Sequence, residues 1–274
     1  MKKAKVLFVS QEIFPYTEET PMSKMARFLP QGIQERGKEI RTFMPRFGLI
    51  NERRNQLHEV IRLSGMNIIM DNNDHPLIIK VASIQSARMQ VYFIDNEDYF
   101  QRKSMAYDKD GKFYQDNDER TVFFARGVVE TVRKLGWAPD IIHCHGWMSS
   151  MLPMIVKKAL KEDPLFADSK MVVSLYNDDF PGAFPAGFSK KILMEGIEKN
   201  DVDHLSNTDY EVLMKNALDF ADGIVFASPT IHPGVESYAK SLEKPILKYQ
   251  DPENYHDAYN DFYDEVLLGV TELA

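Results

Sequence analysis

The nine residues Pro139-Asp140-Ile141-Ile142-His143-Cys144-His145-Gly146-Trp147 decide the fold class of this 274-residue chain. The short apolar segment at 140–142 is typical of a buried strand, and helical patterning resumes at Trp147. The two histidines and Gly146 therefore occupy the turn after a strand, which is where an open α/β sheet binds its ligands. The rest of the chain fits around this turn as alternating strands and helices.

Short apolar runs alternate with amphipathic segments along most of the sequence. We predict strands at 6–10, 40–44, 88–95, 171–175, 223–227 and 244–247, and helices at 25–37, 119–135, 147–160, 210–220 and 233–242. Segments 66–70 and 77–81, separated by a polar turn at 71–76, predict a β-hairpin, and 255–271 predicts an amphipathic closing helix. The fold class is therefore α/β. We expect a single Rossmann-like, doubly wound, mostly parallel sheet with a β-hairpin insertion, in one domain spanning 1–274.

Composition excludes several classes of partner. A net charge of -8 argues against nucleic acid or an anionic membrane, because both require concentrated Lys and Arg. The apolar run at 6–9 is too short for a signal peptide, and no stretch reaches the roughly 18 apolar residues of a transmembrane helix. The sole cysteine, Cys144, cannot form an intrachain disulfide, which fits a reducing compartment. We therefore expect a cytoplasmic protein.

The histidine pair in the opening stretch suggests two kinds of chemistry. His143 and His145 stand two residues apart, so a strand would point both imidazoles to one face, as a metal pair requires. No carboxylate or further histidine lies at a recognised ligand spacing, so we favour a packed His143, a His145 that faces the cleft, and no metal. Alternation puts the Cys144 side chain opposite both histidines, which favours a small buried hydrophobe over a nucleophile.

Segment 11–24 follows the first predicted strand, where a Rossmann-like sheet usually holds phosphates on backbone amides. It contains no glycine and three glutamates, Glu12, Glu18 and Glu19. A pyrophosphate cannot easily approach the backbone without glycine, and the local negative charge opposes it. We therefore predict that this loop binds no nucleotide phosphate, and we expect no cofactor.

Acidic, amide and aromatic residues between 95 and 120 have the composition of a carbohydrate site. They are Asp95, Asn96, Tyr99, Phe100, Arg102, Asp116, Asn117, Asp118 and Arg120. Sugars offer hydroxyls for hydrogen bonds and C–H faces for aromatic packing, so this mixture suits them. A solvated charged surface explains the same composition equally well.

Several segments, in order along the chain, resemble the N-terminal half of bacterial glycogen synthases and plant starch synthases. The family's opening strand K-V-L-F-V-x-x-E is similar to 5–12, and its V-Y-F-I-D-N-x-x-Y-F-x-R segment is similar to 91–102. Its P-D-I-I-H-x-H-D-W element matches 139–147, and its A-D-x-V-x-x-x-S-P element matches 221–229. Looser matches lie at 29–48 and 116–120.

The resemblance implies the N-terminal half of a B-type glycosyltransferase, in which ADP-glucose and an α-1,4-glucan primer meet between two Rossmann-like domains. It implies that His145 lies beside the donor glucose as the candidate catalytic residue. It also implies substrate contacts from Asp95, Asn96, Tyr99, Arg102, Trp147 and Asn177. The predicted closing helix corresponds to the last helix of the two-domain relatives, which crosses back onto this domain.

The sequence also departs from the family. Gly146 stands where the family has aspartate, and Tyr176 stands where its T-x-H-N motif has histidine. The K-T-G-G-L loop, whose lysine and glycines serve the sugar nucleotide, falls at 16–22 and is absent. We also expect the C-terminal donor-binding domain to be absent.

Three functions follow from this combination. The first is a domain that binds a glucan or another saccharide and is not a competent transferase alone, with ADP-glucose disfavoured. The second is an active glucosyltransferase completed by a donor domain on a separate polypeptide. The third is a regulatory or scaffolding subunit that docks a protein partner on the face a second domain would cover. An exposed apolar patch at 177–188 would favour such a partner, and a polar surface there would favour a self-sufficient domain.

Overall fold

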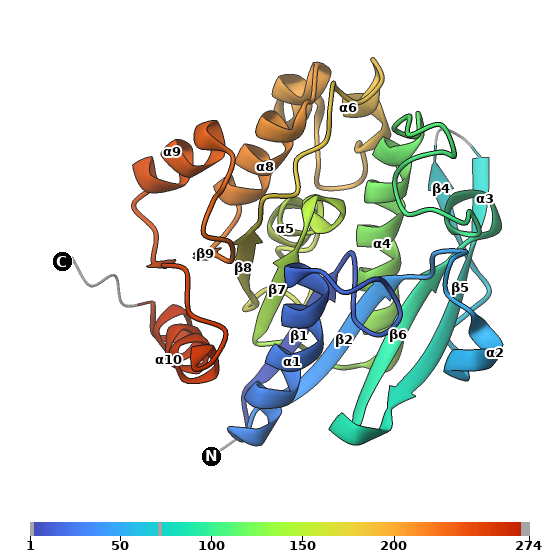
Figure 1. Cartoon of the computed structure of the whole chain (residues 1–274). Coiled ribbons are helices and arrows are strands. Elements are labelled where there is room, and N and C mark those ends of the chain that lie inside the picture. Colours follow the sequence, from blue (N-terminus) through green and yellow to red (C-terminus); the bar gives the residue numbers. More distant parts are fainter. Residues whose placement is uncertain (1–2, 71–72, 270–274) are drawn as a thin grey trace.

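The computed structural model describes residues 3–70 and 73–269 of the chain (Figure 1). Its central sheet has the strand order β10-β9-β8-β7-β1-β2-β6-β5-β3, with β4 paired to β5. The strands are β1 (Lys5–Ser10), β2 (Glu39–Pro45), β3 (His58–Glu59), β4 (Met66–Met70), β5 (Asn73–Ile84), β6 (Met89–Asp95), β7 (Ile141–His145), β8 (Lys170–Leu175), β9 (Gly223–Phe226) and β10 (Ile246–Leu247).

Neighbouring strands run parallel in the part of the sheet with the order β10-β9-β8-β7-β1-β2-β6, and β1 lies in its centre between β2 and β7. Val9 of β1 lies opposite Phe43 on one side and Cys144 on the other. Both faces of these strands are covered, which explains why they are continuous apolar runs and not alternating ones. The chain leaves β1 toward one edge and β7 toward the other, so the predicted doubly wound α/β sheet is confirmed.

The predicted β-hairpin exists, but the predicted turn is too long. β5 pairs antiparallel with both β4 and β6, and Met70 already lies opposite Asn73. The polar residues at 73–75 therefore belong to a strand, because a two-stranded ribbon beyond the main sheet leaves their side chains near solvent. Residues 71–72 of the predicted turn lie outside the described residues.

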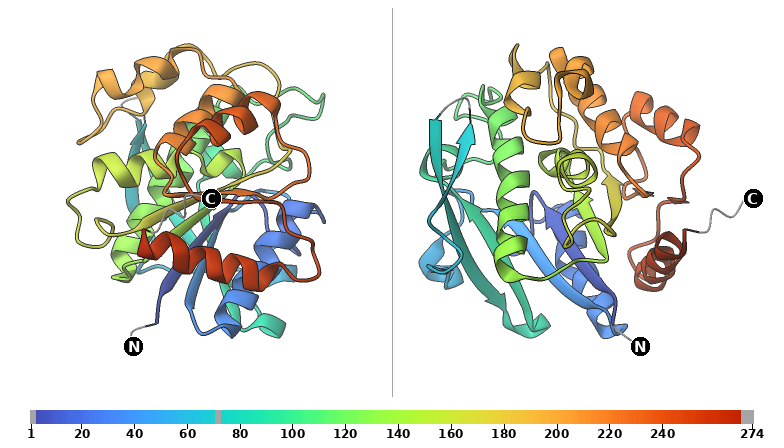
Figure 2. Two further views of the ribbon diagram at one scale, coloured as in Figure 1. Left: turned by 90° about the vertical axis from the view of Figure 1, so that its left-hand side faces the viewer. Right: turned by 180° about the vertical axis from the view of Figure 1, so that it is seen from behind.

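Helices cover both faces of the sheet (Figures 1 and 2). One apolar cluster joins α1 and α10 to one face of β1, β7, β8 and β9, and a larger one packs α4, α5 and α8 on the opposite face. The helices are α1 (Pro21–Glu35), α2 (Glu52–Asn55), α3 (Glu97–Phe100), α4 (Asn117–Leu135), α5 (Leu152–Met154), α6 (Phe188–Lys191), α7 (Lys199–Val202), α8 (Tyr210–Asp219), α9 (Pro233–Ser241) and α10 (Tyr255–Leu268). Shorter helical turns are η1 (Gln85–Ala87), η2 (Trp147–Ser149), η3 (Ile155–Ala159) and η4 (Asp203–Ser206).

The single helix predicted at 147–160 is wrong in detail. The segment consists of η2, a 3₁₀ turn, then α5, and then η3, which is a π-helical turn. Pro153 lacks the N–H that a continuous helix would need at this point, so the regular hydrogen-bond ladder is interrupted. The interruption places Trp147 and Met148 in a tight turn at the carboxyl end of β7.

The closing helix α10 lies against α1 and the sheet (Figure 2, left). Tyr259 and Tyr263 are fully buried in this interface, and Arg36 pairs with Asp257 at 2.6 Å. The predicted helix at 255–271 is thus confirmed as far as Leu268, while its end beyond 269 lies outside the described residues. Among residues 3–70 and 73–269, no helix has the length and apolar character needed to cross a membrane.

Candidate functional site

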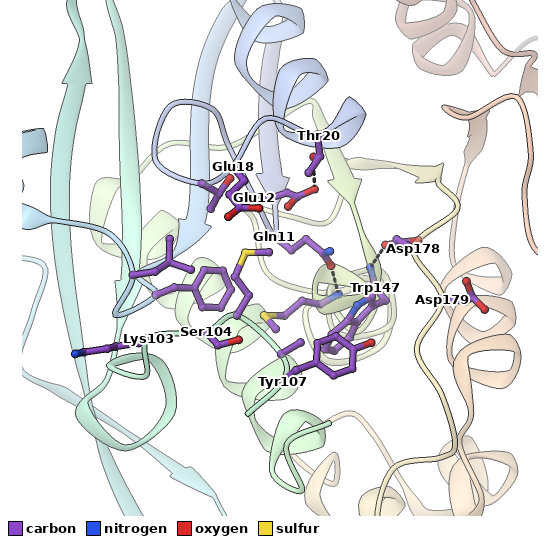
Figure 3. A pocket seen from close by; sticks show the side chains of 16 residues that line it. Gln11, Glu12, Glu18, Thr20, Lys103, Ser104, Tyr107, Trp147, Asp178 and Asp179 are labelled. Carbon is purple, nitrogen blue, oxygen red and sulfur yellow. Dashed lines mark hydrogen bonds between the residues drawn. The ribbon is translucent and has the colours of Figure 1, made fainter. Parts of the chain in front are cut away.

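A cavity of about 500 Å³ opens at the carboxyl ends of the central strands. It lies beside β1 and β7, where the chain direction across the sheet reverses, and this is the usual ligand position of a doubly wound sheet. Figure 3 shows side chains from several strand ends converging on it. Its lining residues are Gln11, Glu12, Thr17, Glu18, Thr20, Phe47, Leu49, Lys103, Ser104, Met105, Ala106, Tyr107, Trp147, Met148, Asp178 and Asp179.

Two glutamates from the loop after β1 form one wall of the cavity. Glu12 is buried and accepts a hydrogen bond from the Thr20 hydroxyl at 2.6 Å. Burial raises the pKa of Glu12, the Thr20 hydrogen bond opposes that rise, and the nearby negative charges of Asp178 and Glu18 add to it. The two loops that follow β1 and β8 therefore bring like charges close together.

Asp178 ties the loop after β8 to two other elements. Its Oδ2 accepts from the Trp147 N–H at 3.2 Å, and its Oδ1 accepts from the Tyr210 hydroxyl at 2.8 Å. Burial raises the pKa of Asp178 to about 6, although both hydrogen bonds oppose the rise. The carboxylate is thus fixed in orientation at the cavity wall.

Gln11 joins the loop after β1 to the turn after β7 (Figure 3). Its backbone N–H donates to the His145 carbonyl at 3.1 Å, and its Oε1 accepts from the Met148 N–H at 3.2 Å. The Gln11 side chain packs directly against Gly146. A Cβ atom added to Gly146 would lie only 2.5 Å from Gln11 Cδ. Gly146 also has a φ of +83°, which favours glycine. Both the backbone conformation and the contact with Gln11 therefore favour glycine at this position.

The expectation that His145 faces the cleft is wrong. His145 is fully buried and does not line the cavity, because strand alternation points it to the face covered by α1 and α10. Its Nδ1 lies 2.8 Å from the Tyr176 hydroxyl, and its Nε2 has no hydrogen-bond partner among the described residues. Burial lowers the pKa of His145 to about 3, so the ring is neutral at neutral pH.

His143 is a packed residue, as predicted. Its Nδ1 lies 2.6 Å from the Tyr263 hydroxyl of α10, and its Nε2 lies 2.7 Å from the Ser174 hydroxyl of β8. Cys144 points to the opposite face, and burial raises the pKa of its thiol. Within the described part of the chain, no group of three or more His, Cys, Asp or Glu side chains is arranged to hold a metal ion.

Asp95 and Asn96, predicted from the resemblance, do not reach the cavity. Asp95 is fully buried beside Lys80, with Oδ2 and Nζ 3.0 Å apart. Asn96 begins α3 by accepting hydrogen bonds from the N–H groups of Asp98 and Tyr99. Asn96 thus fixes the backbone after β6, whereas Asp95 links β6 to Lys80 of β5.

Tyr99 and Arg102 likewise hold the following loop in place. The Tyr99 hydroxyl donates to Glu119 at 2.7 Å, and the Arg102 guanidinium pairs with Asp116. The next residues along the chain, 103–107, line the cavity. The four residues predicted at 95–102 are therefore brought close to the cavity loop, but they are not on its surface.

Trp147 lines the cavity, whereas Asn177 is exposed at its edge, next to Asp178. The segment 177–188 does not expose an apolar patch. Phe180, Phe184 and Phe188 are buried, and the rings of Phe180 and Phe184 stack at a centroid distance of 5.1 Å. The burial of these rings favours a domain that needs no protein partner at this surface.

The model of the starch synthase catalytic domain matches residues 5–245 of this chain. The chain belongs to that family. It is 35% identical to a glycogen synthase of Pelodictyon phaeoclathratiforme over 253 residues, which are 89% of this chain and 51% of the relative. It is 37% identical to a glycogen synthase of Chlorobium limicola over 194 residues, which are 70% of this chain and 40% of the relative. The chain thus spans about half the length of the curated relatives it matches.

A solved structure, the catalytic domain of starch synthase IV from Arabidopsis thaliana bound to ADP and acarbose, has the same fold with a TM-score of 0.73. It is 16% identical, and the match covers 91% of this chain and 52% of that one. The architecture expected for the N-terminal half of a B-type glycosyltransferase is therefore confirmed.

Sequence reasoning missed most of the cavity wall. In the sequence, Glu12 and Glu18 argue only against phosphate, and Asp178, Asp179 and Tyr107 lie outside the predicted set of site residues. The acidic pair Asp178-Asp179 begins three residues after the strand predicted at 171–175, so the rule that ligands lie at the carboxyl ends of strands indicates it.

Proposed function

We propose that this domain is a cytoplasmic saccharide-binding member of the starch synthase family, which takes an α-glucan in the cavity and does not transfer glucose by itself. The composition of the cavity carries this proposal. Carboxylates, an amide and hydroxyls provide hydrogen bonds for sugar hydroxyls, and Trp147 and Tyr107 provide rings for C–H faces. The volume of about 500 Å³ is in the range of ligand pockets, roughly 300–1,000 Å³.

The same wall disfavours a nucleotide donor. Four carboxylates and one lysine, Lys103, line the cavity, so a diphosphate would meet a predominantly negative surface. The Arabidopsis relative was solved with both ADP and acarbose. For this chain we expect only the saccharide to bind, because the loop after β1 has glutamates and no glycine.

In this proposal, most of the residues predicted from the resemblance hold the segments that line the cavity and do not contact the saccharide. His145 holds Tyr176, which comes two residues before Asp178. Asp95, Asn96, Tyr99 and Arg102 position the loop that continues into residues 103–107. Trp147 contacts the sugar directly, and Asn177 stands at the rim.

Calorimetric titration of the whole chain with maltotriose, ADP and ADP-glucose tests the proposal. We expect maltotriose to bind and both nucleotides to give no heat. Asp179→Ala should weaken maltotriose binding by roughly tenfold to a hundredfold, the equivalent of one lost hydrogen bond to a charged group. Asp168→Ala is the matched control, since Asp168 is exposed and does not line the cavity.

Micromolar binding of ADP-glucose would overturn the proposal and favour the alternative of a transferase completed by a donor domain on another polypeptide. Absence of any saccharide binding would favour a regulatory or scaffolding role instead. The buried phenylalanine rings of segment 177–188 speak against docking of a partner at that surface.

A further inference from the structure

A short hairpin at 106–114 supplies part of the cavity wall. Its two arms pair antiparallel at Tyr107 and Phe113. Asp108 closes the turn, because its Oδ1 accepts hydrogen bonds from two backbone N–H groups of the turn, both at 2.9 Å. Tyr107 lines the cavity, whereas Phe113, on the second arm, does not. These hydrogen bonds hold the two arms together, but they do not by themselves fix where the hairpin lies over the cavity.

Phe113 joins this hairpin to the loop that follows β8. Its ring stacks on Phe180 at a centroid distance of 4.8 Å and an interplanar angle of 10°, and it lies parallel to the ring of Phe184 at 6.3 Å. Within the described part of the chain, no hydrogen bond or ion pair joins 106–114 to 177–188. Phe113 is therefore the aromatic link between the two segments.

The same rings surround Trp147. Its indole packs against Phe180 at 5.1 Å and against Phe184 at 6.2 Å. Phe113 contacts the Trp147 ring at 5.6 Å and the Tyr107 ring at 5.5 Å. Trp147 and Tyr107 line the cavity and are the rings assigned above to the C–H faces of a sugar (Figure 3). Phe113 thus contacts both of these rings without lining the cavity itself.

The first arm of the hairpin also faces the loop after β8. Burial raises the pKa of the Tyr107 hydroxyl, and the negative charge of Asp179 adds to the rise. Tyr107 comes from the hairpin and Asp179 from the loop, and both line the cavity. The position of the hairpin therefore determines how these two walls of the cavity face each other.

We propose that Phe113 is a positioning residue of the cavity, which holds Trp147 and Tyr107 in place for the saccharide without contacting it. The proposal rests on the saccharide-binding function proposed above and adds a residue to it. An aromatic pair contributes roughly twofold to tenfold to an equilibrium constant. Without the ring of Phe113, the hairpin also adopts positions away from the loop after β8, and the apparent affinity falls with the fraction of molecules in the closed arrangement.

Two variants at position 113 separate the effect of the ring from that of apolar volume. Phe113→Leu keeps an apolar side chain and removes the ring, whereas Phe113→Tyr keeps the ring. In calorimetric titration with maltotriose, Phe113→Leu should bind roughly fivefold to fiftyfold more weakly than the wild type, and Phe113→Tyr should stay within about twofold of it. Lys112→Ala is the matched control, since Lys112 is exposed on the same hairpin and does not line the cavity. Thermal unfolding verifies that all variants are folded.

A measurement without ligand tests the positioning directly. The chain has two tryptophans, so a ¹H–¹⁵N spectrum gives two indole signals. In Phe113→Leu, relaxation dispersion should show microsecond-to-millisecond exchange at the Trp147 indole that is absent in the wild type and in Phe113→Tyr. Trp137 is the internal control, because it contacts Lys5 and Arg41 at the opposite end of the strands.

The outcomes separate this inference from the proposed function. If maltotriose binds equally to the wild type and to Phe113→Leu, or if Phe113→Tyr is weakened as much as Phe113→Leu, positioning by the ring is refuted and saccharide binding stands. If maltotriose does not bind to the wild type, the saccharide function is refuted. In that case exchange at Trp147 in Phe113→Leu alone still supports the positioning role, and its absence overturns it.

Discussion

Replacement of Gly146 by alanine should destabilise the protein by about 2–4 kcal/mol, a sum of two effects. Gly146 has φ 83° and ψ 157°, a backbone region nearly restricted to glycine, and other residues there cost about 1–3 kcal/mol. An alanine Cβ would lie 2.5 Å from Cδ and Oε1 of Gln11. The Gln11 side chain must then move and lose the hydrogen bond from the Met148 N–H, which contributes about 0.5–1.5 kcal/mol.

Urea unfolding followed by circular dichroism measures this change in the free energy of unfolding. Gly136→Ala is the matched control, because Gly136 has φ +58° and no atom within 4 Å of its added Cβ. It should lose only about 1–2 kcal/mol, the ordinary cost of a left-handed backbone. A Gln11→Ala change combined with Gly146→Ala should cost less than the sum of the two single changes, since the shortened side chain removes the clash.

A Gly146→Ala protein within about 0.5 kcal/mol of the wild type would refute this reasoning, because surface substitutions without strain usually fall in that range. The turn after β7 would then adopt a conformation open to other residues. Contact with Gln11 would then not be a reason for glycine at position 146. A loss of about 2–4 kcal/mol that Gln11→Ala does not relieve would assign the whole cost to the backbone.

Three further changes test other parts of the structure. The raised pKa of Asp178 means that the folded state binds its proton up to a higher pH than the unfolded state, so ionisation of Asp178 lowers the stability of the wild type between about pH 4 and pH 6. Asp178→Asn should remove this decrease. In urea unfolding at different pH values, the free energy of unfolding of the wild type should fall by up to about 3 kcal/mol relative to the variant over this range. Tyr263→Phe should cost about 1–3 kcal/mol in the same assay, since it removes a hydrogen-bond partner of buried His143. Lys191→Met should cost about 3–5 kcal/mol, because buried Asp118 then lacks its cation.

Each of these changes has an outcome that would contradict it. If the free energy of unfolding changes equally between pH 4 and pH 6 in the wild type and in Asp178→Asn, the raised pKa of Asp178 is contradicted. Tyr255→Phe is the control for helix α10, because the Tyr255 hydroxyl forms no hydrogen bond within the described part of the chain. An equal loss in both tyrosine variants would contradict a specific role for Tyr263. Lys161→Met, at an exposed lysine without an ion pair in the described chain, should be nearly neutral.

The sheet could be predicted because buried parallel strands leave a strong signal. The runs around Val9, Ile142 and Val173 are apolar on both faces, and only a sheet covered by helices on both sides requires this pattern. The helix at 147–160 was predicted as one element because its apolar spacing is helical. Periodicity does not register the missing N–H of Pro153, which breaks the element into three turns.

The site was less predictable than the sheet, because its lining comes from loops that meet only in the folded chain. The position of Trp147 could be predicted, since it directly follows a central strand. The orientation of His145 could not, because the resemblance fixes a position in the sequence but not whether a neighbour such as Tyr176 covers the ring. Asp178 gains its role through Tyr210, more than 30 residues away, and no local pattern indicates that contact.

The contrast between strands and loops also explains how one family scaffold can change the residues that line its cavity. Substitutions in a strand such as β1 disturb packing on both faces, whereas Glu18 and Asp179 stand in loops at the carboxyl edge and carry little of the core. The negative charge of Glu18 nevertheless opposes ionisation of the buried Glu12 and helps to raise its pKa. Charge repulsion at a concave site that lowers stability and contributes nothing to folding is typical of a functional constraint. The acidic wall is therefore better explained by what the cavity binds than by the fold.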